Sequence, residues 1–256
     1  MNRKQISFLL KIFLLPVLLF CFSFQPFKAK PRLLVFSRTT GYHHASIPDG
    51  IAAVQMLGKQ NGFDVDTTTS PALFRDDVLK KYAALVFMST TDSARTLLGN
   101  DAEQALQRYI RAGGGFVGVH AATDAEYTWD WYGKMIGAYF LSHPKIQEAV
   151  LHVTDASHPA TKGLPAEWKR TDEWYNFKNL SSDIHVLITI DENSYTGGKN
   201  GNFHPMSWWH DFEGGRIFYT ELGHTSESYK DPLYLQHLLG GIKYAIGKNE
   251  KLRYKK

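Results

Sequence analysis

The stretch GGGFVGVHAATD, residues 113–124, decides the fold, because a short apolar run breaks there into a turn of small residues. The run from Phe116 to Val119 is typical of a buried strand, and Gly118 leaves room for a close neighbour. Small residues after His120 let a helix start directly behind the strand. Such a turn presents His120 at the carboxyl end of its strand, where open α/β sheets bind ligands. The alternative is a core strand whose histidine only caps a backbone carbonyl.

The chain before this stretch alternates β-rich and helical segments. We predict strands at 33–37, 63–68, 83–89 and 116–120, and helices at 47–61 and 101–112. This alternation implies an α/β protein with a mainly parallel sheet flanked by helices. The second half is less regular, with further strands predicted at 148–154, 185–190, 206–209 and 216–220, a helix around 129–137 and a closing helix at 232–246.

The first 29 residues are typical of an export signal. Arg3 and Lys4 precede an uncharged stretch from Ile12 to Phe24, which is short for a membrane span. We therefore divide the chain into a signal peptide at 1–29 and one domain at 30–256, secreted or located in the periplasm, with no stable membrane insertion beyond the signal. An uncleaved anchor is the alternative, because the flank around Ala29 is a poor cleavage site.

The composition excludes two classes of function. Four of the 29 basic residues and none of the 25 acidic residues lie in the signal segment, so the domain itself is near neutral. A near-neutral domain gives no support to a nucleic-acid partner. The single cysteine, Cys21, also lies in the signal segment, which leaves the domain without a disulfide or a thiol nucleophile.

Three predicted strands each run into a loop that carries a histidine. His44 lies in GYHHASIP (41–48), His120 in the stretch quoted above, and His224 in YTELGH (219–224). Adjacent histidines rarely point the same way, and we choose His44 over His43 because it is closer to the helix start. The alternative is that both are exposed loop histidines.

Three such imidazoles together with a carboxylate have the composition of a divalent transition-metal site of the zinc, manganese or iron class. We predict His44, His120 and His224 as metal ligands, and His120, Glu173 and His224 as catalytic residues. No two of them share a helix turn, so spacing alone does not establish the set. The alternative is metal-free chemistry, in which His120 and His224 exchange protons with a bound ligand. No nucleotide cofactor is expected.

Several aromatic and polar residues are candidates for contact with a substrate. We assign this role to Tyr42, Asp124, His143, Trp174, Tyr175, His204 and Trp208. For Asp124, capping of the following helix is an alternative role. A competing hypothesis is a non-catalytic carbohydrate-binding domain, with Trp131, Trp174, Tyr175 and Trp208 as a shallow stacking platform and the histidines scattered outside it.

From Leu33 to about Gly247, the chain resembles the ThuA-like family, which is named for trehalose utilisation. The resemblance is carried by GYHHASIP (41–48), GVHAATD (118–124), GAYF (137–140) with His143 and Pro144, DEWY (172–175), and GRIFYT (215–220) with LGH (222–224). His43 departs from the family pattern, in which we expect an arginine.

The resemblance implies both a fold and a class of reaction. The family is similar in architecture to class I glutamine amidotransferases, so we expect a flavodoxin-like three-layer sandwich. His120 occupies the place of the nucleophilic cysteine of those enzymes, and without a cysteine in the domain thioester chemistry is excluded. The resemblance further implies a role in disaccharide and glycoside catabolism, with 3-keto sugars as substrates and a lyase, hydrolase or isomerase reaction. A small saccharide or glycoside is the expected partner, and the oligomeric state is left open.

Overall fold

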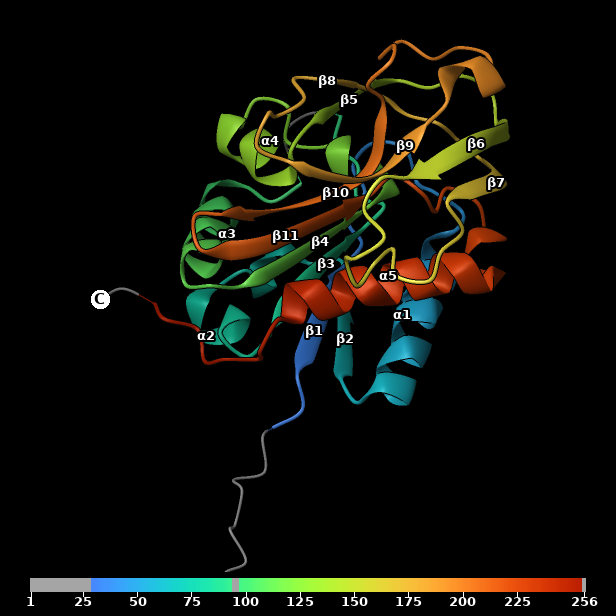
Figure 1. The fold of residues 1–256 in the computed structure, drawn as a ribbon. Helices are drawn as coiled ribbons and strands as arrows, with labels where there is room; N and C mark the ends of the chain where they lie inside the picture. The colour runs from blue at the N-terminus through green and yellow to red at the C-terminus, as the bar shows by residue number, and fades with distance from the viewer. Residues whose placement is uncertain (1–28, 94–96, 255–256) are drawn as a thin grey trace, which may run out of the picture.

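A nine-stranded sheet runs through the centre of the protein in the computed structural model, which describes residues 29–93 and 97–254 (Figure 1). The predicted export signal lies outside these residues, apart from Ala29. Among the described helices, none combines the length and the apolar character that a bilayer span needs.

The order of the strands divides the sheet into two halves. Along the sheet they lie as β2-β1-β3-β4-β11-β10-β9-β6-β7. Pairing is parallel from β2 to β11 and antiparallel from β11 to β7. The strands are β1 (Arg32–Phe36), β2 (Asp64–Thr68), β3 (Ala84–Met88), β4 (Gly115–Val119), β6 (Gln147–Val153), β7 (Glu167–Asp172), β9 (His185–Ile190), β10 (Pro205–Phe212) and β11 (Gly215–Thr220), with β5 (Tyr139–Ser142) and β8 (Asn176–Lys178) in a separate small sheet.

Helices cover both faces of the parallel half, which confirms the predicted α/β sandwich. One face carries α1 and α5, which lie side by side, and the other carries α3 and α4 (Figure 1). The helices are α1 (Ile47–Asn61), α2 (Asp76–Leu79), α3 (Asn100–Arg111), α4 (Asp130–Ile136) and α5 (Pro232–Ile246), with short 3₁₀ turns η1 (Pro71–Leu73), η2 (His120–Thr123), η3 (Glu192–Ser194) and η4 (Ser228–Lys230).

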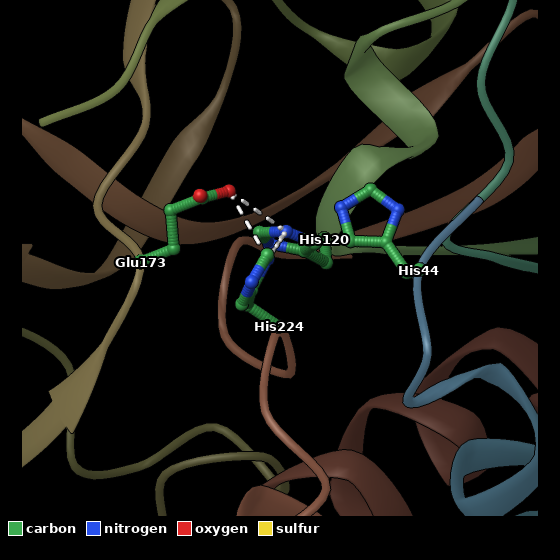
Figure 2. A group of neighbouring side chains, drawn as sticks. All are labelled: His44, His120, Glu173 and His224. Atoms are coloured by element: carbon green, nitrogen blue, oxygen red, sulfur yellow. Dashed lines mark hydrogen bonds and ion pairs between the residues drawn. The ribbon is translucent and has the colours of Figure 1, made fainter. Parts of the chain in front are cut away.

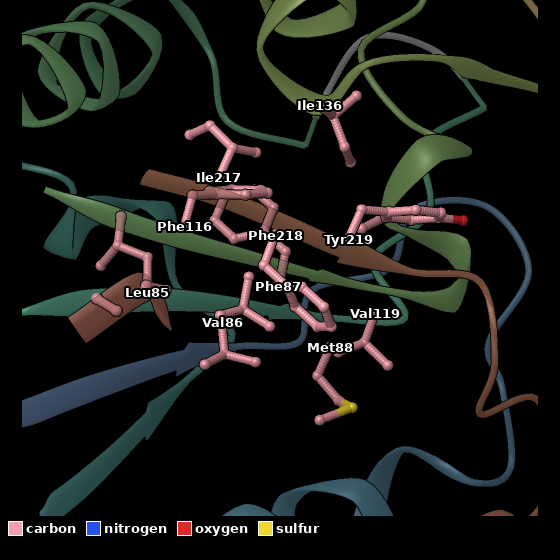
Figure 3. Close-up of a cluster of buried hydrophobic side chains, with 14 of the residues drawn as sticks. Leu85, Val86, Phe87, Met88, Phe116, Val119, Ile136, Ile217, Phe218 and Tyr219 are labelled. Atoms are coloured by element: carbon pink, nitrogen blue, oxygen red, sulfur yellow. The ribbon is translucent and has the colours of Figure 1, made fainter. Parts of the chain in front are cut away.

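The core sits on β3 and β4, whose residues are all buried. Phe87 and Phe116 lie with ring centroids 4.8 Å apart on the face covered by α4, as Figure 3 shows for the surrounding cluster. Both glycines of β4 permit a close approach of a neighbour. A Cβ at Gly115 would lie 2.1 Å from the carbonyl oxygen of Ala245 in α5, and one at Gly118 would lie 2.9 Å from the ring of Tyr219.

The topology brings four strand ends to one edge. In the parallel half, β1, β4 and β11 point the same way, and three further antiparallel steps after β10 return β7 to that direction. The antiparallel half also folds back on the rest of the molecule, because Arg170 of β7 donates a hydrogen bond to Ser228 of η4. The segments that follow β1, β4, β7 and β11 therefore meet.

A candidate metal-binding active site at the carboxyl edge

Four side chains from these four segments converge. One ligand atom from each of His44, His120, Glu173 and His224 lies within 4.8 Å of those of the other three. Figure 2 shows the three imidazoles grouped together, with the Glu173 carboxylate facing His120 and His224. The structure thus brings together the whole group that the sequence singled out, including the carboxylate.

His120 is held in one orientation by its surroundings. It is the first residue after β4 and has a φ of 48°, an unusual value for a side-chain-bearing residue that commonly marks functional turns. Its Nδ1 lies 2.7 Å from the backbone oxygen of Glu221, so Nδ1 carries the proton. Nε2 consequently faces the cluster, where His224 Nδ1 is 3.0 Å away.

Glu173 connects the histidines. One carboxylate oxygen lies 3.1 Å from His224 Nδ1 and 3.5 Å from His120 Nε2, and the other lies 2.9 Å from His143 Nδ1. Burial alone would raise the pKa of Glu173, but hydrogen bonds and charge from His120 and His224 outweigh it and hold this pKa well below its usual range. These surroundings therefore favour the charged form of Glu173.

His44 is buried against the other two histidines of the cluster. It is 2% exposed, and its ring stands edge-on to those of His120 and His224, with centroids 4.8 and 5.1 Å away. Burial, followed by the charges of His120 and His224, lowers the pKa of His44 to about 2. The ring is neutral, and its buried Nδ1 has no hydrogen-bond partner among the described residues.

A pocket of about 300 Å³ opens onto the cluster. It is lined by Tyr42, His44, Asp124, Phe140, His143, Glu173, Tyr175 and His224. The Tyr175 ring packs against His120 with centroids 4.4 Å apart. Tyr42 is 65% exposed and stands at the mouth, with its ring edge-on to His44. Four of the seven predicted substrate contacts, Tyr42, Asp124, His143 and Tyr175, thus line one cavity.

Asp124 offers a second carboxyl group to the pocket. The Tyr127 hydroxyl donates a hydrogen bond to it. Burial raises the pKa of Asp124 despite that hydrogen bond. The pocket therefore holds one carboxyl group whose surroundings favour the charged form, Glu173, and one whose surroundings favour the neutral form.

The other three predicted substrate contacts do not line this pocket. Trp174 and Trp208 are fully buried, and their indole nitrogens donate hydrogen bonds to the backbone oxygens of Gln147 and Ile136. His204 is also fully buried, with Nε2 2.7 Å from the backbone oxygen of Tyr175. Their assignment to substrate contact is wrong because each is enclosed by protein.

The aromatic platform of the carbohydrate-binding hypothesis is not formed either, because three of its four residues do not line the pocket. Trp174 and Trp208 are sealed in the interior, and Trp131 stacks on Trp129 and donates to the Glu213 carboxylate away from the pocket. Of the four proposed stacking residues, only Tyr175 lines the cavity.

Three residues of the site were not predicted. Phe140 lines the pocket, while Asp172 and Glu221 are fully buried carboxyl groups directly behind the cluster. Asp172 and Glu221 stand in the motifs that carry Glu173 and His224. The sequence signal that could have identified them is a carboxyl group within three residues of a candidate ligand.

The residues present fit a divalent transition metal. Neutral imidazoles and a carboxylate are the ligands that zinc-class ions prefer, and burial lowers the pKa of His44, so that its ring is neutral and can bind an ion. The hydrogen bond from His120 Nδ1 to a backbone oxygen is the outer contact that metal-bound histidines usually make. The buried cluster could therefore hold a metal ion.

Comparison with known proteins shows which family the chain matches. A family model described as ThuA, trehalose utilisation, matches residues 32–245. No curated protein matches the chain in sequence. Among solved structures, a protein described as ThuA-like from Bacteroides uniformis has a TM-score of 0.72 at 23% identity, with 87% of this chain and 94% of that chain covered.

Two further structures share the fold. A second protein described as ThuA-like, from Parabacteroides merdae, has a TM-score of 0.70 at 22% identity and covers 89% of this chain and 93% of its own. A β-galactosidase from Bacillus circulans has a TM-score of 0.55 at 11% identity, with 89% of this chain and 32% of that chain covered. At these identities the likeness shows the fold alone.

Proposed function

Because this chain belongs to the ThuA family, we propose that it processes a saccharide or glycoside in the pocket at the carboxyl edge. His44, His120 and His224, with Glu173, hold a divalent transition metal there. The observation that carries the proposal is the convergence of these four groups within 4.8 Å at the base of a cavity. Titratable groups with shifted pKa values in a concave pocket are typical of catalytic sites.

The bound metal would act as a Lewis acid on a carbonyl or hydroxyl oxygen of the sugar. The protein's own groups then move protons. The surroundings of Glu173 favour its charged form, and the carboxylate oxygen that lies 2.9 Å from His143 Nδ1 can accept a proton from the ligand. A 3-keto sugar is the favoured substrate, because the proton on the carbon beside its carbonyl is acidic enough for a carboxylate to remove.

The rest of the pocket recognises the sugar. The Asp124 carboxyl and the His143 imidazole offer hydrogen bonds to hydroxyl groups, while the rings of Tyr175 and Tyr42 pack on apolar sugar faces. The volume of about 300 Å³ lies at the lower end of the range for small-molecule sites, which suits one sugar ring inside the pocket.

The decisive experiment combines metal analysis with turnover. The purified protein is assayed for bound transition metals and incubated with trehalose and its 3-keto derivative, with and without a chelator. We expect about one metal ion per chain and turnover that the chelator abolishes. If turnover resists the chelator but is lost in His120→Ala, the reaction would use metal-free acid/base chemistry instead of a bound metal. Sugar binding without turnover of any tested glycoside would instead establish a carbohydrate-binding domain.

Export is a second part of the proposal, supported by the basic start and the uncharged stretch from Ile12 to Phe24. The test is fractionation of cells that express the whole chain, followed by N-terminal sequencing. We expect a processed chain in the periplasm or medium. Full-length soluble protein in the cytoplasm would reject export and leave the site proposal untouched.

A further inference from the structure

Two turns that carry cluster residues are built alike. Residues 172–175 begin with the last residue of β7, and residues 221–224 follow β11. Each turn begins with a carboxyl group that is fully buried, Asp172 in one and Glu221 in the other. Each also contains one cluster residue, Glu173 or His224. The two turns lie about 50 residues apart in sequence and meet only in the folded protein.

Asp172 binds the turn that carries His224. One of its oxygens accepts hydrogen bonds from the backbone N–H of His224 at 3.2 Å and from that of Glu173 at 3.1 Å. Its other oxygen accepts from the backbone N–H of Gly223 at 3.1 Å. A single carboxylate therefore holds the backbones of two cluster residues from different strands.

The same carboxylate is anchored from behind. Its second oxygen also accepts from the Arg170 guanidinium at 2.9 Å and from the Ser228 hydroxyl at 3.1 Å. The Arg170 guanidinium lies over the rings of Trp168 and Tyr234, 4.8 and 5.3 Å from their centroids. These contacts leave the Asp172 carboxylate little freedom to rotate.

Glu221, in the turn after β11, in turn binds the backbone of the turn after β7. Its side chain accepts a hydrogen bond from the backbone N–H of Tyr175 at 3.0 Å, and its own backbone oxygen accepts from His120 Nδ1 at 2.7 Å. Glu221 thus fixes both the tautomer of one cluster histidine and the backbone of the tyrosine that packs on it.

We propose that Asp172 and Glu221 form a reciprocal carboxylate clasp that sets the spacing of the metal ligands Glu173, His224 and His120. They are positioning residues, because they act through backbone groups and touch neither metal nor substrate. The clasp rests on the proposed metal function for its purpose, although its hydrogen bonds exist independently. Loss of such outer contacts usually lowers metal affinity 10–100-fold.

Backbone hydrogen exchange, followed by NMR on the metal-free protein, tests the clasp without reference to metal. We expect Asp172→Asn to speed exchange at Gly223 and His224 about tenfold or more, because an amide offers one acceptor oxygen where the carboxyl group offers two. Glu221→Met should do the same at Tyr175. Glu221→Gln keeps an acceptor atom at that place and should leave Tyr175 protected.

Metal affinity, measured by competition with a chelating dye, gives the functional arm. We expect Asp172→Asn and Glu221→Met to bind Zn²⁺ about 10–100-fold more weakly and to change the absorption spectrum of bound Co²⁺, which reports ligand geometry. The control is Asp155→Asn, whose carboxylate accepts a hydrogen bond from the backbone N–H of Ser157 at 2.8 Å in an exposed turn. It should leave both measurements unchanged.

The outcomes separate the two claims. Faster exchange everywhere in the chain, or no change at residues 175, 223 and 224, would overturn the clasp. Should Asp172→Asn fail to fold, the comparison of Glu221→Met with Glu221→Gln decides the question alone. If the wild-type protein binds no metal, the proposed metal site is rejected, and the clasp loses its proposed purpose. This holds even if the exchange results agree with the predicted hydrogen bonds.

Discussion

At the scale of single residues, the loop after β1 shows how two adjacent histidines take different roles. His43 is exposed, and its Nδ1 lies 3.0 Å from the hydroxyl oxygen of Thr39. His44 is buried against the rings of His120 and His224. The choice of His44 from its place before the helix thus matches the geometry.

This pair provides a matched test of the metal site. We expect His44→Ala to weaken Zn²⁺ binding on the order of 100-fold or more, because one of four ligands is lost, while the fold persists. His43→Ala should bind Zn²⁺ as the wild type does. Equal affinities in the two variants, measured by dye competition, would exclude His44 as a ligand.

Asp124 permits a test of sugar recognition. Its carboxyl lines the pocket, and we expect Asp124→Asn to weaken saccharide binding about 2–10-fold, the usual range for one hydrogen bond between neutral groups. Tyr127→Phe removes only the hydroxyl that contacts Asp124 and should have a smaller effect. Titration calorimetry measures both. A larger loss in Tyr127→Phe would contradict a direct contact between Asp124 and the sugar.

At the scale of elements, the close contact of β4 with α5 depends on Gly115. An added Cβ there would lie 2.1 Å from the Ala245 carbonyl oxygen, which belongs to a helix backbone that cannot move alone. We expect Gly115→Ala to lower the free energy of unfolding by about 1–3 kcal/mol, the usual cost of overpacking. Urea denaturation checks this value. Unchanged stability would mean that α5 can shift away from the sheet at little cost.

Regular elements were predictable where one physical signal dominated. The sequence analysis placed α1, β9 and α5 at the bounds that the structure shows. It missed β7 (Glu167–Asp172), whose residues are alternately exposed and buried. Of its three buried positions, Trp168, Arg170 and Asp172, two carry charged side chains, so the strand lacks the usual alternation of apolar and polar residues. It also missed the small sheet of β5 and β8, whose strands are too short for a periodic pattern.

The site was predictable to the same extent. Histidines at strand ends could be grouped, because parallel strands deliver their carboxyl ends to one edge. The direction of each side chain could not be deduced. Trp174 and Tyr175 are neighbours in one motif, yet Tyr175 lines the pocket while Trp174 points into the interior. The role of Asp172 was equally hidden, because its partners Gly223 and His224 lie far along the chain.

At the scale of the whole molecule, buried neutral histidines make stability depend on pH. Burial is the first cause that lowers the pKa of five of them: His44, His158, His204, His210 and His237. Their folded pKa values lie below the unfolded value near 6.5, so the unfolded chain binds protons first as the pH falls. Glu221 and Asp124 act in the opposite direction, because burial raises their pKa values, but they are two groups against five.

We therefore expect the metal-free protein to lose stability as the pH falls from 7 towards 4.5, by up to about 1.4 kcal/mol per pH unit for each net proton taken up on unfolding. The loss adds to the usual acid denaturation of carboxylates and begins at higher pH. Urea denaturation at several pH values measures the slope. His237→Asn should flatten it and His43→Asn should not; a flat profile between pH 7 and 5 would contradict the assignment of neutral histidines.

The four converging side chains also impose an order of events on a chain that is being synthesised. When the ribosome has released residues up to Glu173, three of the four groups exist, but β11, the neighbour of β4, has not yet been made. The fourth group, His224, and the anchor at Ser228 follow only about 50 residues after Glu173. If the four side chains hold a metal ion as proposed, a chain that stops before His224 would lack one ligand and should bind the ion more weakly than a chain that contains all four.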